Sequence, residues 1–139
     1  MKLIRIATVF VAALTAFNVQ ANDRTPSAAG AAVYIVSPAN GEVVTSPVKV
    51  VFGLSGMGVA PAGTEKKNTG HHHLLVNGKK LPTMDSRMGK EVKHFGGGQT
   101  ETTLELAPGK HTLQLILGDK DHVPHQPPVV SAVVTVVVE

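Results

Sequence analysis

The chain of 139 residues contains no cysteine and no tryptophan, and aromatic residues make up 4% of it. Without cysteine, a disulfide framework, thiol catalysis and a thiolate metal site are excluded. With so few aromatic side chains, a buried core must be built from valine, leucine and isoleucine, which favour β-strands. Beyond the first 21 residues, no apolar stretch reaches the length of about 18 residues that a membrane-spanning helix needs, so no such span is expected there.

The first 21 residues have the three-part layout of a secretory signal peptide. Lys2 and Arg5 give a positive start, residues 6–17 are mostly apolar, and Val19-Gln20-Ala21 places small residues at a cleavage site. We therefore expect export to the periplasm or the outside of the cell, and a mature chain that begins at Asn22. The alternatives are an ordinary N-terminal helix or an uncleaved anchor.

The mature chain is expected to be close to neutral. The whole sequence has 13 basic and 10 acidic residues, a formal net charge of +3, and the signal peptide holds two of the basic ones. Its removal leaves a net charge of +1. The remaining basic residues form no stripe, because Lys66-Lys67 and Lys79-Lys80 are short pairs near predicted turns. Nucleic acid is therefore not an expected partner.

The mature chain alternates short β-like runs with turn residues, which is typical of an all-β sandwich or barrel. Residues 22–32 are small and polar and predict a flexible leader, which is followed by one domain over residues 33–139. Apolar side chains at every second position, such as Val48, Val50 and Phe52, indicate one face that packs in a core. The pair Asn77-Gly78 is typical of a tight hairpin turn. The expected strands cover residues 33–37, 48–54, 71–76, 79–81, 100–106, 111–117 and 129–138.

About seven strands in a domain of this size predict an immunoglobulin-like β-sandwich. A Greek-key barrel is the alternative.

All seven histidines fall within the mature chain, and three of them are adjacent. In the predicted strand 71–76, His71 and His73 point to one face, roughly 7 Å apart because a strand rises about 3.3 Å per residue. Two imidazoles at that spacing can share a metal ion. His72 points to the other face with Leu74 and Val76, which is the expected core side.

Three further histidines lie in predicted loops. His94 precedes a run of three glycines, and His122 and His125 follow the strand 111–117. Because the loops of a sandwich gather at its two ends, we expect these groups to converge. Asp119 and Asp121 can then ligate a metal or orient an imidazole. The candidate metal ligands are His71, His73, His94, His122 and His125.

Neutral imidazoles suit copper(II) or zinc, and the Irving–Williams order favours copper(II). Met57, Met84 and Met88 lie in predicted loops, where their thioethers can hold copper(I) or serve as packing. The histidines also have alternative roles, as hydrogen-bonding groups at a polar strand start or as contacts for an organic ligand.

His111 has a structural explanation of its own. The string from Leu106 to His111 is similar to the corner at which many sandwich domains place a tyrosine that bonds back to the backbone.

Catalytic motifs are weak by comparison. The string from Gly53 to Met57 has methionine where a nucleophile elbow has its last glycine, and no helix is expected after it. We therefore expect no enzymatic activity.

Four strings cover most of the mature chain: SPANGEVVTSPVKVVFGLSGMGVAPAG, NTGHHHLLVNG, HFGGGQTETTLELAPGKHTLQLILGD and HVPHQPPVVS. With their GHHHLL, HFGGGQTET and GKHTLQL motifs, they resemble a bacterial family of exported proteins with a domain of unknown function, over about residues 33–138. Some such chains bear the name of a rod-shape-determining protein, which suits a polytopic membrane protein and does not fit this sequence. The resemblance implies an exported β domain and no particular activity.

The size, the expected compartment and the histidine-bearing and methionine-bearing loops are also similar to those of periplasmic copper carriers with immunoglobulin-like folds, although fold does not imply function. The sequence therefore favours a periplasmic module whose partner is a metal ion, copper or zinc, which it carries or buffers. The alternative is a non-catalytic domain of the cell envelope that uses its histidines structurally and binds another envelope protein or a cell-wall glycan. A hydrolase or oxidoreductase with an open metal position is a third hypothesis.

Overall fold

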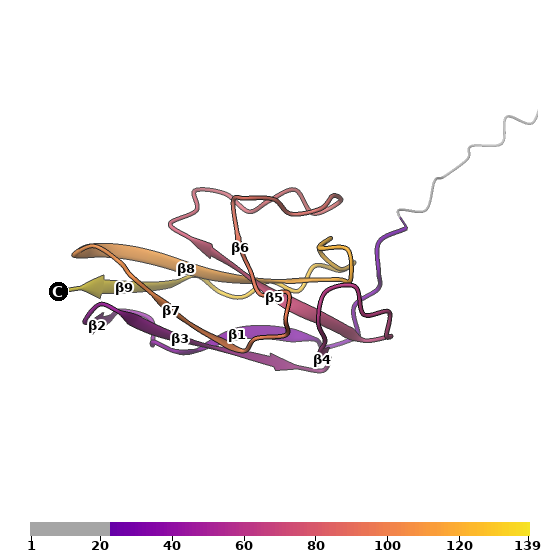
Figure 1. Cartoon of the computed structure of the whole chain (residues 1–139), viewed down its shortest axis with the longest axis horizontal. Helices are drawn as coiled ribbons and strands as arrows, with labels where there is room; N and C mark the ends of the chain where they lie inside the picture. Colours follow the sequence, from indigo (N-terminus) through magenta and orange to yellow (C-terminus); the bar gives the residue numbers. More distant parts are fainter. Residues whose placement is uncertain (1–22) are drawn as a thin grey trace, which may run out of the picture.

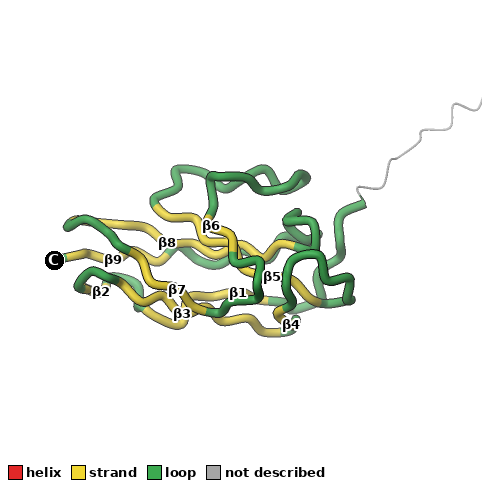
Figure 2. The backbone as a smooth tube through the Cα atoms, viewed as in Figure 1, coloured by secondary structure: helices red, strands yellow, loops and turns green. Residues whose placement is uncertain are grey.

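The structure, a computed structural model, describes residues 23–139, and the predicted signal peptide and its cleavage site lie outside this range. Two β-sheets lie face to face (Figure 1, Figure 2). The smaller sheet has the order β1–β3–β7, and the larger has the order β2–β9–β8–β5–β4, with β6 paired to β5. The strands are β1 (Ala32–Ser37), β2 (Glu42–Val44), β3 (Val48–Ser55), β4 (Gly58–Val59), β5 (Thr69–Val76), β6 (Lys93–His94), β7 (Glu101–Leu104), β8 (Gly109–Gly118) and β9 (Val134–Val138).

The two separate sheets confirm the all-β sandwich and set aside the barrel alternative. Within residues 23–139, no helix is long and apolar enough to cross a membrane.

The main core lies between the two sheets and is built from the alternating positions that the sequence indicates. Val50 of β3 and Leu113, Leu115 and Leu117 of β8 are all fully buried there. Each such side chain removes apolar surface from water, which is worth about 1.5–3 kcal/mol for a valine or leucine. Branched aliphatic residues therefore supply most of this core, as the scarcity of aromatic residues predicts.

Strands β5 and β8 are buried on both faces. Leu74 of β5 faces the main core, whereas Leu75 and Ile116 belong to a second apolar cluster with Met88 and Val92. The last two residues come from the cover loop, residues 77–92, which leaves β5 and crosses the outer face of the larger sheet before β6 (Figure 1). The cover loop thus forms a third layer over β5 and β8.

The predicted hairpin at Asn77-Gly78, with a strand over residues 79–81, is wrong. A type I′ turn needs a positive φ at both central residues. Asn77 has a φ of 55°, but Gly78 is not among the positive-φ glycines. The Asn77 side chain is instead attached to β8, where its oxygen accepts a hydrogen bond from the Thr112 amide at 3.0 Å. The chain therefore leaves the sheet at this point and enters the cover loop.

The predicted leader is partly tied to the sandwich. The Ser27 amide donates to the Gln126 carbonyl at 3.1 Å, and the Gln126 amide donates to the Thr25 carbonyl at 3.0 Å. The Arg24 guanidinium also donates to the carbonyl oxygens of Pro124 and His125. Residues 24–27 thus run beside the loop that carries His122 and His125.

Candidate metal centre

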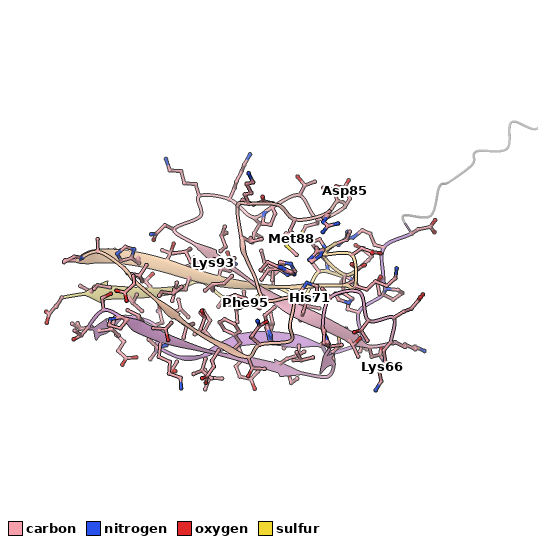
Figure 3. The ribbon with its side chains drawn as sticks, in the orientation of Figure 1. Lys66, His71, Asp85, Met88, Lys93 and Phe95 are labelled. Atoms are coloured by element: carbon pink, nitrogen blue, oxygen red, sulfur yellow. The ribbon has the colours of Figure 1, made fainter. Side chains whose placement is uncertain are left out.

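Four histidines come together on the outer face of the larger sheet. Figure 3 labels one of them, His71, together with Met88 of the cover loop. Each offers one ring nitrogen, and these four atoms all lie within 4.8 Å of one another. The structure thus groups four of the five candidate ligands and leaves His125 outside. The histidine cluster consists of His71, His73, His94 and His122.

Strand pairing explains three of the four positions. His71 and His73 are two residues apart on β5, so both side chains leave the same face of the sheet. His94 of β6 lies directly opposite His73 in the antiparallel ladder. On the other edge of β5, His71 lies opposite Gly118, the last residue of β8. The turn that follows β8 therefore starts beside the cluster and delivers the fourth histidine.

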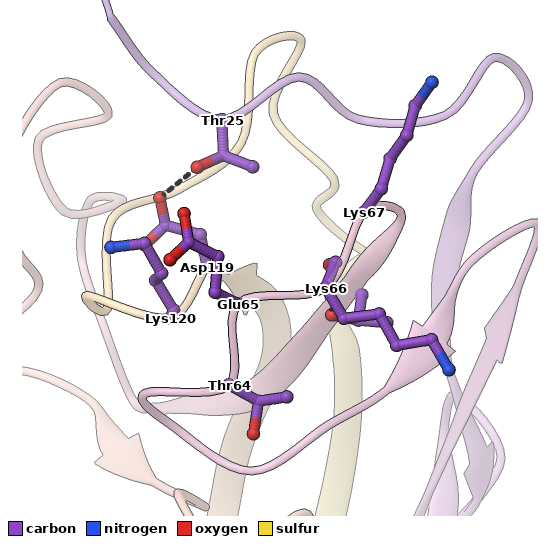
Figure 4. Close-up of a pocket in the computed structure, with 8 residues that line it drawn as sticks. Thr25, Thr64, Glu65, Lys66, Lys67, Asp119 and Lys120 are labelled. Carbon is purple, nitrogen blue, oxygen red and sulfur yellow. Dashed lines mark hydrogen bonds between the residues drawn. The ribbon is translucent and has the colours of Figure 1, made fainter.

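The turn over residues 119–123 holds His122 in place. One carboxylate oxygen of Asp119 accepts hydrogen bonds from the amides of Asp121 and Val123 at 2.9 and 3.0 Å. The other accepts from the Thr25 hydroxyl at 2.6 Å, a bond drawn in Figure 4. His122 itself has a φ of 67°, which a non-glycine residue adopts in tight turns. Asp119 therefore shapes the turn that presents His122.

Burial alone would raise the pKa of the Asp119 carboxyl, but the hydrogen bonds from Thr25, Val123 and Asp121 outweigh it and hold that pKa below its ordinary value. Asp119 is thus an anion whose carboxylate accepts hydrogen bonds from the turn and from Thr25.

One ring nitrogen of the cluster lies within hydrogen-bonding distance of two others. Nε2 of His71 lies 3.1 Å from Nδ1 of His122 and 3.2 Å from Nε2 of His94. A ring nitrogen has either one proton or one lone pair in the ring plane, so it forms one good hydrogen bond and not two. Within residues 23–139, Nδ1 of His71 and both ring nitrogens of His73 are buried without a hydrogen-bond partner.

Lowered pKa values favour the neutral forms of His71, His73 and His122. Burial, with the nearby imidazoles of His122 and His94, lowers the pKa of His71 to about 4. Burial, with His71 and His94 close by, lowers the pKa of His73 to about 3. The pKa of His122 is also lowered, by burial first and then by His94. Neutral imidazoles have free lone pairs, which is the state that binds metal ions.

The remaining histidines have other surroundings. His125 is fully buried, and its Nε2 lies 3.2 Å from the Thr69 carbonyl at the start of β5. Its ring covers Gly70, where an added Cβ atom would meet Cε1 of His125 at 2.9 Å. His72 faces the main core, as predicted, with its ring centroid 5.1 Å from that of Phe52. Neither belongs to the cluster.

His111 closes the corner that the sequence predicts. Its Nε2 donates to the Ala107 carbonyl at 2.8 Å. Its Nδ1 accepts from the side-chain amide nitrogen, Nδ2, of Asn77 at 2.8 Å. Because a carbonyl can only accept and a side-chain amide nitrogen can only donate, the two contacts assign the ring proton to Nε2. The hydrogen bond from His111 back to the backbone, which the sequence predicts, is confirmed.

Two of the loop methionines, Met57 and Met88, have different surroundings. Met57 is partly buried and packs against the main core. Met88 is 6% exposed and lies in the second apolar cluster, on the same side of the sheet as the histidines. The sequence alone does not distinguish the two, because both lie in glycine-containing loops.

A separate pocket of about 210 Å³ is lined by Asp119, by residues 64–69 and by Thr25 of the N-terminal segment (Figure 4). Its lining is polar and charged, with Glu65, Lys66, Lys67 and Lys120 among the residues around it. None of the four cluster histidines lines this pocket.

The fold and the site define the class as a small β-sandwich that carries a four-histidine cluster able to hold a metal ion. The chain belongs to the family of the domain of unknown function DUF4399, which matches residues 50–139. This bears out the expected domain of unknown function. No curated protein matches the chain. Among solved structures, the chain is similar to the fibronectin(III)-like modules of Clostridium thermocellum CbhA, at 15% identity and a TM-score of 0.42, over 77% of this chain and 95% of that one.

Proposed function

We propose that this protein is a metal-binding module that carries or buffers copper(II) or zinc in the periplasm or outside the cell. The ligands are His71, His73, His94 and His122. The observation that carries the proposal is the position of Nε2 of His71, which lies 3.1 and 3.2 Å from two other ring nitrogens. A shared cation satisfies both contacts at once, which a single hydrogen bond cannot do.

The spacing of the nitrogens also supports a shared ion. With metal–nitrogen bonds of about 2.0–2.1 Å, two ligands of a tetrahedral ion lie about 3.3 Å apart. The separations of 3.1 and 3.2 Å between Nε2 of His71 and its two neighbours are close to that value. Four imidazoles without a carboxylate or thiolate suit copper(II) and zinc, and copper(II) binds more tightly of the two.

Carriage or buffering fits a site with four protein ligands better than catalysis does. Catalytic zinc sites keep three protein ligands and leave one position for water or substrate. Here four imidazoles can fill a tetrahedral shell. His71 and His73 are buried, whereas His94 is exposed and His122 is partly so. An incoming ion can therefore meet the outer pair first and reach the inner pair afterwards.

The expected export supports the same function. The signal peptide predicted over residues 1–21 sends the chain to a compartment where copper and zinc enter from outside. A sequence without cysteine suits that compartment as well, because it has no thiol to be oxidised there.

Direct metal titration tests the proposal. The mature protein, without a tag, is titrated with copper(II) and with zinc against a chromophoric chelator, and its bound metal is counted by mass spectrometry. We expect one ion per chain in the wild type and a large loss of affinity in the variant His94→Ala/His122→Ala. The matched control, His111→Ala/His125→Ala, removes two imidazoles outside the cluster and should retain the wild-type affinity. Circular dichroism confirms that each variant is folded.

A second variant, His71→Ala/His73→Ala, removes the buried pair and should abolish binding. The proposal is wrong if the wild type binds neither metal with submicromolar affinity, or if both cluster variants bind as the wild type does. In the first case, the histidines hold the outer layer of the fold together.

A further inference from the structure

The cover loop brings one soft side chain to the histidine cluster. Met88 lies in the middle of this loop, and its backbone amide donates to the His122 carbonyl at 3.0 Å. The loop that covers the cluster is thus fastened to the turn that supplies one of its ligands. Figure 3 shows the Met88 side chain reaching from the cover loop toward the sheet above His71.

The end of the Met88 side chain lies next to His73. An added Cβ atom on Gly118 would be 3.0 Å from Cε of Met88 and 2.9 Å from Nδ1 of His73, so both atoms border the same small space. Both ring nitrogens of His73 are buried without a hydrogen-bond partner within residues 23–139. The inner side of the cluster therefore has a thioether methyl group and two unpaired nitrogens in close proximity.

We propose that the thioether of Met88 is a further donor at the histidine cluster and lets the site hold copper(I) as well as copper(II). The inference rests on the proposed function, because it names the metal and its oxidation states for the same site. Copper(I) prefers soft ligands such as thioethers, whereas zinc and copper(II) are served by imidazole. A methionine at the inner side thus favours the reduced ion.

Burial favours the same ion. Met88 is 6% exposed and His73 is 1% exposed, so a cation between them is largely removed from water. A singly charged ion costs less to desolvate than a doubly charged one, because the desolvation penalty grows with charge. The group of four histidines itself contains no carboxylate ligand. His73 and Met88 therefore form the end that suits copper(I), and His94 and His122 form the end that faces solvent.

Packing alone accounts less well for this methionine. Leu75, Val92 and Ile116 fill the rest of the second apolar cluster and are all branched aliphatic residues. A leucine could supply the same apolar volume at position 88, and exchange between leucine and methionine usually costs less than about 1.5 kcal/mol. Met88→Leu is for that reason a suitable test, because it keeps the packing and removes the sulfur.

The affinities of wild type and Met88→Leu are measured for copper(I), under ascorbate with a copper(I)-selective chelator, and for copper(II) and zinc. We expect the copper(I) affinity of Met88→Leu to fall by about tenfold or more, the range in which groups around a metal site affect its affinity. The copper(II) and zinc affinities should not change. A selective tenfold loss lowers the reduction potential of bound copper by about 59 mV. X-ray absorption of the copper(I) protein should show a sulfur ligand that the variant lacks. Met57→Leu, which changes a methionine that packs against the main core, is the matched control.

The outcomes separate the two proposals. If the wild type binds zinc and copper(II) but Met88→Leu binds copper(I) equally well, the role of Met88 is overturned while the proposed function stands. If Met88→Leu loses affinity for all three ions alike, Met88 acts through packing and the inference is also overturned. If the wild type binds no metal, both proposals fail together.

Discussion

Gly118 makes room for the histidine cluster. It is the last residue of β8 and lies opposite His71, on the face of the sheet from which the cluster histidines project. An added Cβ atom there would be 2.5 Å from Cε1 of His73, a distance at which one of the two groups must move. Any other residue at this position would push the His73 ring or the Met88 side chain away from its place. The absence of a side chain at residue 118 is therefore part of the site.

Gly118→Ala should weaken metal binding and the fold together. The added methyl group overpacks the inner side of the cluster, and overpacking of a buried site costs about 1–3 kcal/mol. Because the His73 ring has to shift, the zinc affinity should fall as well. Urea unfolding and zinc titration measure the two effects. Gly58→Ala is the matched control, since a Cβ atom on Gly58 has its nearest neighbour at 3.6 Å. Equal affinities in Gly118→Ala and wild type would show that His73 is not a ligand.

The sequence predicts some of these residues and not others. The alternation of a strand is enough to separate His71 and His73 from His72, and the structure has this arrangement. His94 joins the cluster because it pairs with His73 across two strands, a long-range contact that local patterns do not contain. His125 lies close to His122 in sequence but outside the cluster, because the turn over residues 119–123 directs it toward the Thr69 carbonyl.

Among the elements, the turn over residues 119–123 depends on one carboxylate. Asp119 accepts two backbone hydrogen bonds within the turn and one from Thr25 in the N-terminal segment. The amide of Asp119 in turn donates to the Val123 carbonyl at 2.9 Å. This arrangement closes the turn and holds it against residues 24–27, so that His122 projects toward β5.

Asp119→Ala should loosen the turn and lower the metal affinity. Loss of hydrogen bonds to a charged group costs about 1.5–3 kcal/mol for each well-formed bond, so urea unfolding should show a clear loss of stability. The zinc affinity should fall by about tenfold, as for other groups that orient a ligand. Thr25→Val removes one of the three hydrogen bonds and should have a smaller effect on both measurements. If Asp119→Ala bound zinc as tightly as wild type, the turn would not position a ligand.

The longer strands could be predicted and the shorter elements could not. β3, β5 and β8 have runs of apolar residues whose period identifies them from the sequence. β2, β4 and β6 have two or three residues each, and their pairing with β9 and β5 creates them. The supposed hairpin at residues 77–78 fails for a related reason. The Asn77 side chain accepts a hydrogen bond from Thr112 of β8, and β5 ends at Val76 with no paired strand directly after it.

At the scale of the whole molecule, the cover loop adds a third layer to the two-sheet sandwich and buries part of the histidine cluster. Met88 and Val92 of this loop pack on Leu75 and Ile116 of the sheet, which leaves the inner histidines buried. The sequence shows a long loop with glycine and charged residues, which indicates solvent exposure. The loop buries the outer face of the sheet through long-range contacts, and the alternation of apolar residues within a strand does not predict such contacts. The two-sheet core was predictable for that reason, and the covered outer face was not.

This covered face makes the stability of the metal-free protein depend on pH. The pKa of His71 is lowered to about 4 and that of His73 to about 3, both from an ordinary value of 6.5. As the pH falls below about 6.5, the unfolded chain takes up protons that the folded protein does not bind until much lower pH. Stability contributed by the neutral histidines is therefore complete above that pH and decreases as the pH falls toward 4.

The free energy of unfolding, measured with urea in the presence of a chelator, should accordingly be lower at pH 5 than at pH 7. Each of the two histidines can contribute at most about 1.4 kcal/mol per pH unit in this window. His73→Leu removes the group with the lower pKa, so its unfolding free energy should depend less on pH than that of the wild type. Bound zinc adds a further dependence in the same direction, because protons compete with the metal for the same nitrogens. An identical pH dependence in wild type and His73→Leu would mean that His73 is not held neutral by its burial beneath the cover loop.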